Sequence, residues 1–191
     1  LIPGPLDGDP GVLAANGSPT VSHVSPGFIE AHGQALERLR QVFQSADGQP
    51  FILPGSGTLA MEAVGANLVE PGDRVLVVNC GVFGDRFGTM LERYGAQVTH
   101  VKAAPGARPT REAVEDALKT AAFKLMTITH VDTSTGVITD VPALAALGHR
   151  YGVLVVVDGV CSVASEDLQM SAWGGDAALT ASQKALATPP G

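Results

Sequence analysis

The chain has 191 residues and a formal net charge of −7, with 45% hydrophobic and 16% charged residues. This length and composition are typical of one sizeable globular domain. The acidic balance disfavours nucleic acids and anionic membrane surfaces as partners, because both reward basic proteins. We expect neither a secretory signal nor a membrane span, since no run reaches the roughly 18–20 apolar residues that a span requires.

Two cysteines, Cys80 and Cys161, are too few for a disulfide framework. Both lie among small and apolar residues, so we expect buried structural thiols. This pattern favours an intracellular, reducing compartment and is equally compatible with peroxisome, mitochondrion and cytosol.

The first part of the chain divides at about residue 20. Residues 1–20 are rich in proline and glycine and show no sustained period, so they are predicted to form an extended arm. Ser25 followed by Pro26 is typical of a helix start, and apolar positions then recur at helical spacing as far as Phe43. Residues 21–191 are predicted to form one domain.

Strand-like and helix-like segments alternate through that domain. Short apolar segments predict strands at 50–55, 73–80, 96–103, 123–131, 153–159 and 176–182. Amphipathic segments predict helices at 58–69, 83–95, 110–121 and 141–152. Such alternation requires crossover connections, so the fold class is α/β with a mostly parallel sheet covered by helices on both faces.

Ligands of open α/β sheets bind at the carboxyl ends of the strands. The first predicted strand ends in "GSGT", residues 55–58, which opens into a helix. Gly57 permits close approach of a ligand, while Ser56 and Thr58 offer hydroxyls beside the free amides of the helix N-terminus. The segment is therefore either a phosphate site or a plain helix cap.

Other strand ends carry weaker signals. Phe83 lies between glycines, where its ring is either core packing or a platform for a flat cofactor. The segment "HVDTSTG" offers the hydroxyls of Thr133 and Ser134, whereas His130 fits a core histidine better than a catalyst. No set of residues with metal-ligand spacing stands out.

Asp158 and Lys184 carry the sharpest signal. Asp158 ends the apolar run "VLVVV", where a carboxylate needs a partner, although a capping role is the alternative. Lys184 follows the next predicted strand, and a lysine in a partly dry pocket becomes a nucleophilic amine. An amine, a carboxylate, a phosphate site and an aromatic ring are what pyridoxal 5′-phosphate (PLP) requires.

Long motifs strengthen this interpretation. They are "LIPGP", "FILPGSGTLAMEA", "GVFGDRF", "YGAQV", "THVDTSTGV", "VVVDGVCSV" and "LTASQKA". Through them, nearly the whole chain resembles the N-terminal half of the class V, fold-type I PLP-dependent aminotransferases. The similarity is greatest to the alanine–glyoxylate (serine–pyruvate) group found in fungi.

The resemblance implies a role for each matching residue. Lys184 would bind the cofactor aldehyde covalently, and Asp158 would pair with the pyridine nitrogen. The ring would lie between Phe83, where many relatives have tryptophan, and Val160, with Thr133 bonded to its phenolic side. The phosphate would be held by Ser56, Gly57, Thr58 and Gln183.

The expected activity is transfer of an amino group from alanine or serine to glyoxylate, giving pyruvate or hydroxypyruvate and glycine. The substrates are then small amino and 2-oxo acids, and the resemblance implies a homodimer. One alternative is a non-catalytic fragment: the family's arginine for the substrate carboxylate lies in the C-terminal domain, so residues 21–191 would be an incomplete large domain. A cysteine desulfurase is less favoured, since those enzymes usually carry histidines where Phe83 and Gln183 stand.

Overall fold

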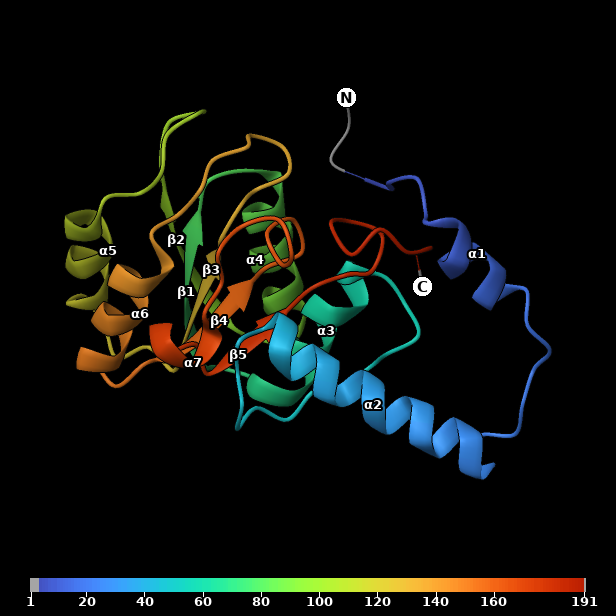
Figure 1. Ribbon diagram of the computed structural model, residues 1–191. Coiled ribbons are helices and arrows are strands. Elements are labelled where there is room, and N and C mark those ends of the chain that lie inside the picture. The colour runs from blue at the N-terminus through green and yellow to red at the C-terminus, as the bar shows by residue number, and fades with distance from the viewer. Residues whose placement is uncertain (1–3, 191) are drawn as a thin grey trace.

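A five-stranded parallel sheet forms the centre of the structure, a computed structural model that describes residues 4–190 (Figure 1). The strands lie in the order β2-β1-β3-β4-β5. Their bounds are β1 Arg74–Asn79, β2 Gln97–Lys102, β3 Leu125–Thr129, β4 Leu154–Asp158 and β5 Ala177–Leu179. The predicted α/β class with a parallel sheet is confirmed.

Helices cover both faces of the sheet, as Figure 1 shows. One face carries α3 (Gly57–Leu68) and α4 (Val82–Arg93). The other carries α5 (Arg111–Leu118), α6 (Val141–Arg150) and the short α7 (Met170–Trp173). The strands are therefore buried on both sides, which is why they read as continuous apolar runs in the sequence.

Strand β1 shows how one strand serves two cores. Val75 and Val77 pack with the α3 and α4 side, whereas Leu76 and Val78 pack with the α5 and α6 side. All four side chains are at most 1% exposed. Since successive residues of a strand point to opposite faces, an unbroken apolar run is what a two-sided core demands.

The strand order reverses between β1 and β3. From β1 the chain first adds β2 on one side. It then crosses to the other side of β1, where β3, β4 and β5 follow in order. At such a switch point the loops diverge above the carboxyl ends of the strands and leave room for a ligand. The fold thus directs attention to the loops after Asn79, Thr129 and Asp158.

The N-terminal region departs from the prediction of an extended arm over residues 1–20. Residues 1–3 lie outside the described part of the chain, but Pro10–Asn16 form helix α1, capped by Asp9, whose carboxylate accepts from the amide of Gly11 at 2.7 Å. A side-chain cap and a proline in the first turn are enough to start a short helix here. The long helix predicted after Ser25 is confirmed as α2, Pro26–Val42.

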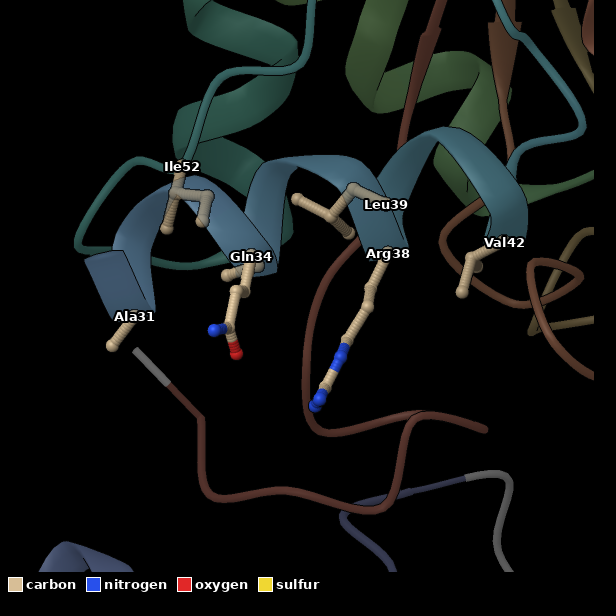
Figure 2. A pocket seen from close by; sticks show the side chains of 7 residues that line it. Ala31, Gln34, Arg38, Leu39, Val42 and Ile52 are labelled. Atoms are coloured by element: carbon tan, nitrogen blue, oxygen red, sulfur yellow. The ribbon is translucent and has the colours of Figure 1, made fainter. Parts of the chain in front are cut away.

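Much of the apolar surface of α2 stays exposed. Phe28 and Ile29 are 40% and 59% exposed, and only the C-terminal end of the helix reaches the core, through Val42. With Ile52 the helix lines an open groove of about 440 Å³, shown in Figure 2. This groove is far larger than a packing defect, but none of the predicted site residues lines it.

The strand predicted at 50–55 is wrong. Phe51, Ile52 and Leu53 are 78%, 48% and 46% exposed and belong to no strand. A β-strand is stable only where a neighbour pairs with its backbone, and no strand within residues 4–190 runs beside this segment. The other predicted elements are present with ends shifted by a few residues, and α7 was not predicted.

Two smaller findings concern membranes and cysteines. Within residues 4–190, no helix combines the length and apolarity that crossing a bilayer would require. Cys80 is buried as predicted, whereas Cys161 is only partly buried, and both thiols are free.

Candidate active site

Asp158 lies at the carboxyl end of β4 and is only 2% exposed. One carboxylate oxygen accepts a hydrogen bond from the amide of Val160 at 3.0 Å. Burial raises the pKa of the Asp158 carboxyl from 3.8 to about 6, the Val160 amide opposes this, and the negative charge of Asp132 adds to it. Burial makes the ionised form of this carboxyl group unfavourable in the ligand-free protein. A cationic ligand group beside it would stabilise the ionised form, so the position suits such a ligand.

The N-terminus of α3 lies beside the loop that follows Asp158. A Cβ atom on Gly57 would stand 3.0 Å from Cγ2 of Val160 and 3.3 Å from Cβ of Ala181. Ser56 occupies the N-cap position, yet its side chain makes no capping hydrogen bond. Its hydroxyl is therefore not used by the helix, which favours the anion site over the plain cap among the two predicted alternatives.

Lys184 lies in the turns that follow β5, five positions after Leu179, and is partly buried. The N-terminal arm runs against it: the amide of Leu6 donates to the carbonyl of Gln183 at 3.3 Å. Gly4 has a φ of +150°, and a Cβ there would lie 2.8 Å from Cδ of Lys184. The arm and the turn are in close contact, and glycine is required for that approach.

Phe83 lies in the first turn of α4, directly after β1, and packs partly on the core formed with α3. The guanidinium carbon of Arg86 lies 4.8 Å from its ring centre, within the range of a cation–π contact. Arg86 therefore lies next to Phe83, a predicted site residue. Arg86 was not predicted as a site residue, because an exposed arginine one helical turn after Phe83 carries no signal in the sequence.

The loop after β3 holds Thr133, which is partly buried, and Ser134, which is exposed. Ser134 was predicted as a hydroxyl donor for a ligand. Its hydroxyl instead donates to Asp132 at 2.5 Å and accepts from the amide of Val82 at 3.0 Å. Asp132 is fully buried and was not predicted, although an aspartate two positions before a serine is a familiar turn signal.

These positions fit PLP. The donor set combines a buried carboxylate at Asp158, a lysine amine at Lys184 and a helix N-terminus at Gly57. The side-chain oxygen of Gln183 is buried without a hydrogen-bond partner among the described residues, so it has capacity for a further group. An anion-binding helix end, a carboxylate and an amine are the groups that a pyridine phosphate aldehyde needs.

Comparison with known proteins supports the same assignment. Residues 12–191 match the family described as "Aminotransferase class-V". Alanine–glyoxylate aminotransferase 1 of Saccharomyces cerevisiae is 40% identical over 200 residues, covering 100% of this chain and 52% of that protein. L-aspartate–glyoxylate aminotransferase of Paracoccus denitrificans is 35% identical, covering 100% of this chain and 50% of that protein.

The fold agrees with a solved structure. The crystal structure of alanine–glyoxylate aminotransferase from Nostoc sp. superposes with a TM-score of 0.96 at 37% identity, covering 100% of this chain and 51% of that one. The chain belongs to the class V aminotransferase family, whose members are PLP-dependent. It spans about half the length of the curated relatives it matches.

Removing the Phe83 ring should weaken cofactor binding. We expect Phe83→Ala to lower PLP affinity by roughly 1–3 kcal/mol, the scale of a lost buried aromatic contact. The measurement is a PLP titration of the cofactor-free protein, with Phe28→Ala on the exposed side of α2 as the control. Equal affinity in the two variants would return Phe83 to core packing.

Proposed function

We propose that the protein containing this chain transfers an amino group from alanine, or serine, to glyoxylate, with PLP as cofactor. The products are pyruvate, or hydroxypyruvate, and glycine. The proposal rests on the buried Asp158 carboxylate at the strand ends, in a chain 40% identical to an alanine–glyoxylate aminotransferase. Both named relatives act on glyoxylate, so the acceptor is better supported than the donor.

The proposal gives four of the site residues a role in the chemistry. When bound, PLP supplies an aldehyde that combines with amino groups and a ring that accepts electrons from Cα. Lys184 binds that aldehyde and moves protons at the substrate's Cα. Asp158 holds a proton on the ring nitrogen, and Phe83 and Val160 exclude water from the two faces of the ring.

The remaining assignments concern anchoring. Ser56, Gly57 and Thr58 bind the phosphate at the start of α3, where unpaired amides favour an anion. Gln183 assists with its side chain, and Thr133 donates its hydroxyl to the phenolic oxygen. These contacts would hold the ring in one orientation, so that the substrate amino group meets it in a fixed position.

The two alternatives remain distinguishable. A cysteine desulfurase is disfavoured by Phe83 and Gln183, which replace the histidines expected there. A non-catalytic protein would form no glycine from alanine or serine in the presence of PLP. A homodimer and an intracellular location belong to the proposal as well, the latter supported by two free cysteines.

The test uses the full-length protein loaded with PLP. We expect absorbance changes on adding alanine that reverse on adding glyoxylate, with glycine and pyruvate formed in equal amounts. Aspartate and serine as donors, compared by kcat/KM, decide the donor class. A protein that binds PLP yet forms no glycine from alanine or serine is not the proposed transaminase.

A further inference from the structure

The first turn of α4, which carries Phe83, lacks a cap of its own. Its N-cap residue is Gly81, which has no side chain to accept from the free amides of the helix. Those amides are instead satisfied from the loop after β3, about fifty residues further along the chain. The amide of Val82 donates to Ser134, as described above, and the next two amides donate to Asp132.

Asp132 joins two loops with its two oxygens. Oδ2 accepts from the amides of Phe83 and Gly84 at 3.0 and 3.4 Å. Oδ1 accepts from the amide and hydroxyl of Ser134 at 2.9 and 2.5 Å. One carboxylate thus ties the turn that carries Phe83 to the turn that carries Thr133.

The environment of Asp132 is built for this contact. The residue is 0% exposed, and within residues 4–190 no lysine, arginine or histidine forms an ion pair with it. Its charge is balanced by four hydrogen-bond donors and by the N-terminal end of the α4 dipole. A Cβ on Gly81 would come within 2.5 Å of its carboxylate, so glycine there leaves the space that Asp132 fills.

We propose that Asp132 is a positioning residue, which caps α4 from the opposite loop and thereby sets the Phe83 ring and the Thr133 hydroxyl at a fixed separation across the cofactor site. This inference rests on the proposed function, because the two residues it aligns are the proposed ring contacts. Asp132 need not touch the cofactor. It acts through the two backbone turns that it joins.

A matched control is available in Asp140. Asp140 caps α6 through the amide of Ala143 at 3.2 Å, on the opposite side of the sheet from α4. Asp140→Ala therefore removes a carboxylate cap of the same kind and leaves every hydrogen bond between the two turns in place. Asp132→Asn removes the charge and keeps one acceptor oxygen, which can still cap α4, whereas its NH2 group cannot accept from the amide of Ser134.

The experiment measures hydrogen exchange and PLP affinity in the full-length protein. In the cofactor-free state, Asp132→Ala should speed exchange of the amides at 82–84, whereas Asp140→Ala should not. Asp132→Ala should raise the PLP dissociation constant at least tenfold, and Asp132→Asn should recover only part of that loss, because one acceptor oxygen cannot serve both turns. Asp140→Ala should change it less than twofold.

The outcomes separate cleanly. If Asp132→Ala does not fold, Gly81→Ala provides the same test, since its Cβ displaces the carboxylate. Unchanged exchange at 82–84, or an affinity loss that Asp140→Ala reproduces, would overturn the positioning role in a protein that still binds PLP. Failure of the unaltered protein to bind PLP would instead overturn the proposed function.

Discussion

Asp158→Asn should stabilise the cofactor-free protein above pH 6 and remove most of its activity. Burial raises the pKa of the Asp158 carboxyl to about 6, so the folded state holds a proton there that the unfolded state releases near pH 3.8. Its contribution to stability is therefore fully present below about pH 3.8 and is lost as the pH rises through 6. The loss amounts to about 3 kcal/mol at 1.36 kcal/mol per pH unit.

Asparagine removes the charge that is costly to bury. Urea unfolding of the cofactor-free proteins should show the variant more stable than wild type at pH 8, with the difference shrinking towards zero at pH 4. Asp7→Asn, in the exposed arm, controls for the change in net charge. A stability difference that stays constant between pH 4 and pH 8 would show that the buried charge is not its origin.

The same substitution should slow transamination by roughly 10²–10³-fold, the usual scale for removing one electrostatic stabiliser from an active site. A neutral amide cannot keep the ring nitrogen protonated, so the ring accepts electrons less readily. Some PLP should still bind, because the phosphate site is untouched. Near-normal turnover of the variant would refute the role of Asp158, and it would leave the stability prediction standing.

Lys184→Ala should abolish activity more completely, with kcat reduced by roughly 10³–10⁶-fold, as found when a covalent catalytic residue is removed. Lys184→Arg should fail as well, since a guanidinium keeps the charge but not a nucleophilic amine. Lys119→Ala is the control, because Lys119 is exposed and, among residues 4–190, forms an ion pair with Asp116 alone. It should retain wild-type turnover.

The chemical test of Lys184 is independent of activity. Borohydride reduction of the PLP-loaded protein should leave the cofactor attached to the peptide that contains Lys184. Attachment to Lys102, Lys119 or Lys124 would contradict the assignment. Because Gly4 and Leu6 contact the segment of Lys184, loss of the arm should also lower the yield of labelled peptide.

The order of elements and the fold class follow from the sequence alone. Buried parallel strands require apolar side chains on both faces, so β1, β3 and β4 were visible as runs without a partner being known. The end of each apolar run also marked the end of a strand, so Asp158 could be predicted as a residue at the carboxyl end of β4. Local signals were also sufficient for the start of α2, where Ser25 accepts from the amide of Phe28 at 3.4 Å.

Tertiary structure decided what depends on neighbours distant in sequence. The segment 50–55 has the composition of a strand, but a strand also needs a partner for its backbone, and within residues 4–190 none is provided. The hydroxyl of Ser134 could bind a ligand, but in the fold it accepts a hydrogen bond from the amide of Val82 at the start of α4. In the sequence, Asp132 has the features of a turn residue. Its role as a cap appears only in the fold, where it lies opposite the N-terminus of α4, a helix without a side-chain cap of its own. Composition and period record what a residue can do, whereas hydrogen-bond partners and burial depend on which segments the folded chain places side by side.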